Sequence, residues 1–144
     1  MGRALLLSIL SLPISCTTNP ELNLAGTWRG QWTSGGTAGN LEVTFAGKKG
    51  FGDMILYDVT LIATGASCPA GEDRGAGDRT AAFDQDTVHF VVRVPGGAGG
   101  DGIFQFDGAL NGGGEIDGTY RLSSEACPAC VCGLGTTGIW TVLR

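Results

Sequence analysis

Several segments of this chain place a glycine two residues before an aromatic residue. Three of them are Gly26-Thr27-Trp28, Gly118-Thr119-Tyr120 and Gly138-Ile139-Trp140. In a β-strand, residues two apart point to the same face, so each ring lies beside a position without a side chain. This pairing fits bulky rings inside a narrow, curved sheet. We expect these segments to form the first strand and the last two strands of a closed β-barrel.

Alternation of apolar and polar residues continues through the middle of the chain. Residues 87–94 show it most clearly, with valine or phenylalanine at every second position and Pro95 at the end. Period-two patterning over short segments predicts strands, and no segment after the amino terminus has a helical period. We therefore predict an all-β domain over residues 24–144, folded as an eight-stranded antiparallel up-and-down β-barrel.

The connections between these strands are expected to alternate in length. Residues 47–50 predict a tight turn after the second strand, and tight turns also follow the fourth and sixth strands. Residues 34–39 predict a flexible loop after the first strand, and longer loops are expected at 65–78 and 123–135. In an up-and-down barrel the tight turns and the longer loops lie at opposite ends. One end, the closed end, then holds the turns and both chain ends, and the other is a mouth rimmed by loops.

Residues 1–15 have the composition of a secretory signal, with an apolar run too short to span a bilayer as a helix. The run ends in Leu12-Pro13-Ile14-Ser15-Cys16, which resembles a bacterial lipobox. The resemblance implies acylation of Cys16, with residues 16–23 as a membrane tether. It also implies an outer-membrane lipoprotein of the bacterial cell envelope, facing the periplasm or the exterior. The alternative is an ordinary signal peptide with an unrelated cysteine.

The predicted meander and the motif Gly26-Thr27-Trp28 resemble lipocalins and avidin-like barrels, whose first strand carries a Gly-x-Trp motif. In lipocalins a basic residue near the end of the last strand covers that tryptophan, and Arg144 stands at the matching place. The resemblance implies a lipocalin-like barrel with Trp28 buried under Arg144 at the closed end. Arg29 stands where avidin has a tyrosine, so the resemblance implies no biotin pocket.

Composition and residue placement argue against several classes of function. The chain has 9 basic and 14 acidic residues, a net charge of −5, which disfavours nucleic acid as a partner. The single histidine, His89, falls on the outward face of a strand, without a serine or cysteine placed beside it as a nucleophile. The acidic residues fall mostly in turns or on outward faces, with no buried pair for acid–base catalysis. We therefore predict a protein that is not an enzyme and has no cofactor.

Four cysteines, Cys68, Cys127, Cys130 and Cys132, follow Cys16 in the sequence. An even number of cysteines in an exported chain is typical of disulfides. We expect Cys68 to pair with Cys130 or Cys132, and Cys127 with the remaining partner, because a Cys130–Cys132 bridge would close a very small ring. Such pairing would join two loops of the mouth. The alternatives are a metal site for zinc or copper, or a thiol–disulfide exchange site.

The aromatic residues of the predicted strands fall on the inward face. The first interpretation is a packed core, because side chains are able to fill an eight-stranded barrel. The second is a pocket for a small apolar ligand that opens at the mouth. The predicted lining of that pocket is Trp28, Trp32, Tyr57, Phe90, Phe104, Tyr120 and Trp140.

Two functions follow for a non-enzymatic envelope lipoprotein of this kind. One is a binding module that carries a small apolar ligand inside the barrel. The other is a protein-binding or inhibitory barrel that contacts an envelope or secreted partner through its rim loops. A hollow interior would favour the first function, and a filled interior would favour the second.

Overall fold

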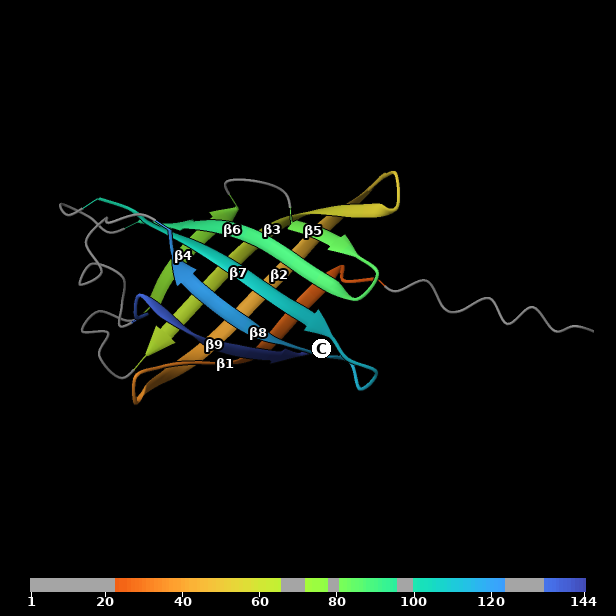
Figure 1. Cartoon of the computed structure of the whole chain (residues 1–144). Coiled ribbons are helices and arrows are strands. Elements are labelled where there is room, and N and C mark those ends of the chain that lie inside the picture. Colours follow the sequence, from red (N-terminus) through yellow and green to blue (C-terminus); the bar gives the residue numbers. More distant parts are fainter. Residues whose placement is uncertain (1–22, 66–71, 78–80, 96–99, 124–133) are drawn as a thin grey trace, which may run out of the picture.

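The computed structural model describes residues 23–65, 72–77, 81–95, 100–123 and 134–144. These residues form one antiparallel sheet that closes on itself (Figure 1), so the predicted all-β barrel with up-and-down connectivity is confirmed. The described part of the chain includes no helix long and apolar enough to cross a membrane. The strands are β1 (Gly26–Ser34), β2 (Thr37–Phe51), β3 (Met54–Gly65), β4 (Glu72–Gly77), β5 (Ala81–Asp84), β6 (Thr87–Val94), β7 (Gly102–Leu110), β8 (Glu115–Leu122) and β9 (Thr137–Leu143).

These strands occupy eight positions in the ring, because β4 and β5 share one. Both pair with β3 on one side and with β6 on the other, β4 toward the mouth and β5 toward the closed end. Ala76 of β4 opposes Thr60, and Ala81 of β5 opposes Tyr57. The chain therefore advances five residues from β4 to β5 while the paired strand β3 spans only three. The fourth position is thus an interrupted strand with two extra residues. Pairing of β1 with β9 closes the ring.

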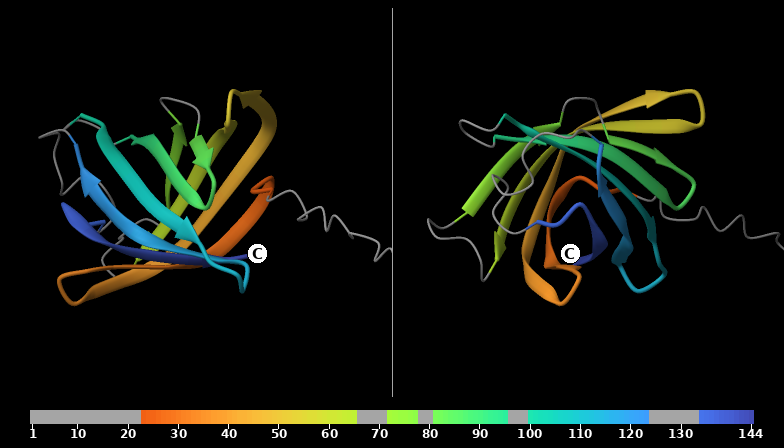
Figure 2. Two further views of the ribbon diagram at one scale, coloured as in Figure 1. Left: turned by 45° about the vertical axis from the view of Figure 1, so that its right-hand side comes forward. Right: turned by 60° about the vertical axis from the view of Figure 1, so that its left-hand side comes forward.

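The polarity of the barrel agrees with the expected one. The β2–β3, β5–β6 and β7–β8 turns lie at the same end as the start of β1 and Arg144 (Figures 1 and 2). The β1–β2 turn lies at the opposite end, where β3, β6 and β8 also finish. The first is the closed end and the second is the mouth. Both ends of the described chain therefore leave from the closed end.

The expected flexible loop at 34–39 is instead a two-residue turn, so the predicted alternation in connection length is wrong at this point. β1 ends at Ser34 and β2 already begins at Thr37. Gly35 and Gly36 have φ angles of 54° and 89°. Positive φ at both central residues matches the right-handed twist of the strands that a hairpin joins, and glycine adopts it without steric cost.

The expected turn at 47–50 is also wrong, because these residues lie inside β2. The chain reverses at Gly52-Asp53, between the paired residues Phe51 and Met54. The register between β2 and β3 shifts between Ala46 and Lys49, and Gly47 has a φ of 64°. The glycine therefore forms a β-bulge, and β2 continues past it as a long hairpin arm.

The expected loop at 65–78 contains β4, which the sequence pattern did not reveal. The inward positions of β4 carry Asp73 and Gly75 in place of large apolar residues. Its strand conformation depends on the ladder with β3, where Thr64 opposes Glu72 and Thr60 opposes Ala76. Neighbouring strands, rather than a buried apolar face, define this element.

Large rings lie beside glycines inside the barrel, as predicted, and the pairing also runs across strands. Trp32 opposes Gly39, and Trp140 opposes Gly118. A Cβ atom at Gly118 would lie only 1.8 Å from the carbonyl oxygen of Asp107 on β7. The absent side chain lets the strands approach and bend around the Trp140 indole.

Each tryptophan donates its indole N–H to a backbone carbonyl. The Trp28 indole donates to Leu24 at 2.7 Å, and the Trp32 indole donates to Thr64 at 3.0 Å. The Trp140 indole nitrogen lies 3.2 Å from both Asp107 O and Thr119 O, which belong to the cross-strand pair next to Gly108–Gly118. The polar edge of each buried ring is thereby satisfied, which fixes the ring orientation.

Candidate functional site

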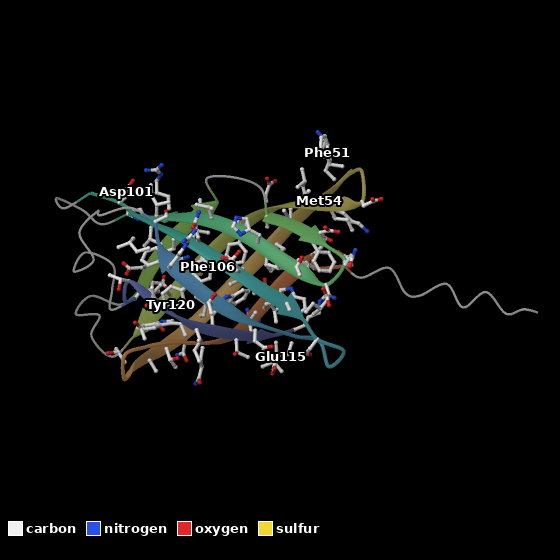
Figure 3. All side chains as sticks on the ribbon, in the orientation of Figure 1. Phe51, Met54, Asp101, Phe106, Glu115 and Tyr120 are labelled. Carbon is white, nitrogen blue, oxygen red and sulfur yellow. The ribbon has the colours of Figure 1, made fainter. Side chains whose placement is uncertain are left out.

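All seven side chains that the sequence predicts as a ligand lining face the barrel interior. Each of them is at most 2% exposed. Three further rings, Phe45, Phe83 and Phe106, are buried equally well. Figure 3 shows Phe106 and Tyr120 within the barrel wall, in contrast to Phe51 at the tip of the β2–β3 hairpin. The interior thus gathers ten of the eleven aromatic residues of the chain.

These rings fill the interior by direct contact with one another. Phe90 and Phe106 stack with ring centroids 4.9 Å apart and planes 5° from parallel. Trp140 presents its edge to both, at 5.6 and 5.7 Å. Phe45 extends the contacts toward the closed end, and Tyr120 extends them toward the mouth. Five side chains of the predicted lining, Tyr57, Phe90, Phe104, Tyr120 and Trp140, thus pack in the core where a ligand was predicted.

The closed end is sealed by the segment that precedes β1. Leu24 is fully buried, and its backbone N–H donates to the Tyr57 hydroxyl at 3.2 Å. That hydroxyl also lies 3.2 Å from the side-chain oxygen of Asn23. Arg144 covers Trp28 from the outside, with Cζ 5.4 Å from the ring centroid. The placement of Arg144 over Trp28 is the one that the lipocalin resemblance implies.

One side of the mouth is covered by the residues that lead into β9. Leu134 is 1% exposed and belongs to the core. A Cβ atom at Gly135 would lie 2.0 Å from Ser34 Oγ, so this segment rests directly on the end of β1. Ser34 Oγ donates to the Thr137 carbonyl at 2.6 Å, and Leu122 N donates to the Thr136 carbonyl at 2.7 Å. Sequence reasoning treated Leu134 as part of a loop and missed its role in the core.

The Tyr120 hydroxyl is the polar group buried closest to this cover. Its oxygen is buried, with no hydrogen-bond partner of good geometry in the part of the chain that the structure describes. Burial raises the pKa of the Tyr120 phenol, and hydrogen bonding with Ser34 and Gly135 offsets part of that rise. The Tyr120 hydroxyl is therefore only weakly bonded to its described neighbours at the mouth.

Asp73 contributes a second unpartnered atom on the inner face. It opposes Ala63, which is buried, and its Oδ2 is buried without a hydrogen-bond partner within the described segments. Desolvation raises the pKa of the Asp73 carboxyl. Sequence reasoning missed this residue because it assigned 65–78 to a loop. The place of Asp73 opposite Ala63 became evident only once β4 was paired with β3.

Three open depressions lie on the outer wall of the described part of the barrel. One of about 450 Å³ lies over β7, β8 and β9, beside Asp107, Arg121 and Ile139. Two of about 400 and 390 Å³ lie over β1, β2 and β3 and share Asn40 and Thr64. Their linings combine outward-facing polar residues with apolar surface.

The remaining predicted residues are placed as follows. His89 faces outward as expected, and its Nδ1 lies 2.6 Å from Oδ1 of Asp107, its cross-strand partner. Among the described residues, no group of three His, Cys, Asp or Glu side chains is arranged to hold a metal ion. The lipidation site Cys16 lies outside the described residues, as do the four predicted disulfide cysteines.

Comparisons with protein-family models, with characterised proteins and with solved structures found no match to this chain. The lipocalin resemblance therefore rests on the Gly26-Thr27-Trp28 motif, the position of Arg144 and the closed meander. Barrels of this kind serve many unrelated functions, so fold alone assigns none. The binding chemistry has to be argued from the residues of this chain.

Proposed function

We propose that this protein is a non-enzymatic, lipid-anchored barrel of the bacterial cell envelope that binds a partner protein through its mouth. The observation that carries the proposal is the packed interior, in which seven ring-to-ring contacts join five residues of the predicted ligand lining to one another and to Phe45 and Phe106. A filled barrel is a rigid support, and recognition then belongs to the loops that it presents. An inhibitor-type role, in which the mouth loops occupy a partner's surface, fits this arrangement.

The direction of the chain supports an outward-facing mouth. A lipid on Cys16 would hold the closed end near the membrane, because the described chain enters there beside Tyr57. The mouth would then face away from the membrane, toward proteins of the periplasm or the exterior. Disulfides among Cys68, Cys127, Cys130 and Cys132 would pin two mouth loops and reduce the ordering cost of partner binding.

A second candidate function is supported by the unpartnered Tyr120 hydroxyl and Asp73 carboxylate. These two groups lie on the inner face in the mouth half of the barrel. A small apolar molecule with a hydrogen-bond donor would satisfy them if it displaced Leu134 from the core. This reading keeps the lipocalin-like carrier role, with the ligand seated in the mouth and the stacked rings beneath it.

Site-specific photocrosslinking in the envelope tests the first proposal. A crosslinking residue at Thr137, exposed at the mouth end of β9, is compared with one at Asp86, exposed in the β5–β6 turn of the closed end. We expect a discrete protein adduct from position 137 that position 86 does not form. Identical adducts from both positions, or none from 137, would contradict a mouth-directed partner. Solvent extraction of the purified protein, with one small molecule released per chain, would favour the second candidate instead.

A further inference from the structure

The β2–β3 hairpin extends past the rest of the barrel at the closed end (Figures 1 and 2). β1 begins at Gly26, opposite Phe45, so the last six residues of β2 extend beyond its ladder with β1. On the other side the arm remains attached, because Met54–Tyr57 of β3 pair with β5. The result is a projecting hairpin with a fixed base and a free tip.

The tip carries the one aromatic residue that the core does not use. Phe51 is 69% exposed, whereas the other ten aromatic side chains are at most 2% exposed. Figure 3 shows Phe51 and Met54 together at the end of the hairpin, away from the barrel wall. A single exposed ring is common on protein surfaces, so its meaning depends on the side chains that share its face.

The bulge at Gly47 decides which side chains accompany Phe51. After the bulge, Lys49 opposes Leu56 and Phe51 opposes Met54. Cross-strand partners share a face, and Ile55 on the opposite face packs against the core. Lys49, Phe51, Met54 and Leu56 therefore form one outward face, called here the tip face. It combines an apolar end with a basic residue, and Lys48 stands beside it in the bulge.

The chain enters the barrel at the base of the same hairpin. The side-chain oxygen of Asn23 lies 3.2 Å from the hydroxyl of Tyr57, the β3 residue opposite the bulge. Cys16 precedes Asn23 by seven residues, which span at most about 25 Å when fully extended. A lipid on Cys16 would thus keep the tip face within reach of the bilayer surface.

We propose that the tip face is a second membrane contact, which inserts Phe51 among the headgroups of a bilayer that contains anionic lipids. The proposal rests on the membrane tether at Cys16 for its geometry. Insertion of the apolar side chains contributes most of the binding free energy. The charge of the two lysines contributes less, because Asp53 in the turn and Asp84 opposite Met54 offset part of it. A lone lipid chain anchors weakly, so a second contact strengthens attachment and also fixes which end faces the membrane. Strand addition is disfavoured at this arm by the bulge and by its lysines.

Tryptophan fluorescence with brominated lipids tests this contact in the full chain. The three native tryptophans are buried, so Phe51→Trp introduces an exposed reporter at the tip. Ile139→Trp is the matched control, because Ile139 is 58% exposed on the outer wall of β9. Both variants carry the same residues 1–22. With vesicles of brominated phosphatidylcholine and phosphatidylglycerol, we expect quenching and a blue shift at position 51 and neither change at position 139.

Two further variants separate this contact from the tether. When Cys16→Ala is combined with Phe51→Trp, the quenching at position 51 should persist at higher lipid concentration. In that chain, Lys48→Gln together with Lys49→Gln should weaken binding to phosphatidylglycerol vesicles, by about fivefold for each lysine lost. Equal quenching at positions 51 and 139, or none at 51, would overturn the membrane contact. If the chain with its native Cys16 is found without an acyl group and still shows quenching at position 51, the membrane contact stands and the tether is contradicted.

Discussion

The guanidinium of Arg144, the last residue of the chain, lies over the indole of Trp28 in the first strand, 5.4 Å from the ring centroid. Arg144 also donates to the carbonyl oxygen of Ala25. The two contacts join the beginning and end of the barrel where β1 and β9 pair. They cover the one face of Trp28 that the core leaves open to the closed end.

Truncation of Trp28 tests how much this closure contributes. Trp28→Ala should lower the free energy of unfolding by about 3–5 kcal/mol, because it removes a large core side chain that is 2% exposed. Arg144→Ala should cost much less, about 0.5–1 kcal/mol, as the loss of an exposed cation over a ring. Urea denaturation measures both. A loss under about 1 kcal/mol for Trp28→Ala would contradict the role of this ring in the core.

The two buried tyrosines provide a matched pair for the mouth. Tyr120→Phe removes a buried hydroxyl that has no well-formed hydrogen bond among the described residues, and it should raise the free energy of unfolding by about 1 kcal/mol. Tyr57→Phe removes a hydroxyl bound to Leu24 and Asn23 and should lower it by about 0.5–1.5 kcal/mol. Denaturant melts of the two variants should move in opposite directions. Equal destabilisation would mean that the Tyr120 hydroxyl is bonded in the folded protein.

Replacing a glycine beside one of the rings, even by alanine, should destabilise the barrel. Gly118→Ala should destabilise the barrel by about 1–3 kcal/mol or more, because its Cβ would meet the Asp107 carbonyl at 1.8 Å. Gly112→Ala is the control, since no atom lies within 4 Å of its Cβ position in the β7–β8 turn. Thermal melts should separate the two variants clearly. A Gly118→Ala protein as stable as the Gly112→Ala protein would refute the close approach.

Asp73 should give the stability of the protein a distinct pH dependence. Burial raises the pKa of this carboxyl in the folded state, so the native protein holds the proton more tightly than the unfolded chain. The free energy of unfolding should therefore fall as pH rises from the ordinary aspartate pKa through the raised one. Asp73→Asn should remove that decline, so the variant should gain more stability over the unmodified protein at neutral pH than at acid pH. Glu72→Gln controls for the loss of one negative charge, and denaturant melts across this pH range measure the effect.

The disulfide prediction is decided by peptide mapping under non-reducing conditions. We expect Cys68 linked to Cys130 or Cys132, with Cys127 bound to the remaining cysteine. The long bridge closes a loop of roughly sixty residues, worth about 4 kcal/mol in the chain-entropy model. Four free thiols would contradict the bridge. A metal bound in a fixed ratio and lost together with the fold would support the metal site instead.

Much of the barrel interior was predictable from the sequence, because a strand sends alternate residues to opposite faces. The residues of β6 show this directly, with Val88, Phe90, Val92 and Val94 all buried as predicted. The ring-beside-glycine pattern likewise located β1, β8 and β9. Period-two alternation is a local property of one strand, so it can be recognised in a single sequence without information on the neighbouring strands.

The turns and the fourth position of the ring were decided by tertiary structure. Gly47 and Gly52 have nearly equal φ angles, 64° and 62°, yet one forms a bulge and the other a turn. The choice depends on how far β3 pairs back along β2. The strand β4 has no large apolar inner residue and depends on its ladder with β3, so its local sequence pattern does not predict a strand.

The sequence by itself therefore determined which side chains of the apolar strands face the core and that the sheet closes around them, whereas Leu134 was missed. Only the tertiary structure decided that those side chains fill the interior, because the space inside a barrel depends on how its strands bend and how the rings interlock. It also decided that Phe51 stands apart from every other ring, at the tip of an arm whose length is set by the pairing of β2 with β3.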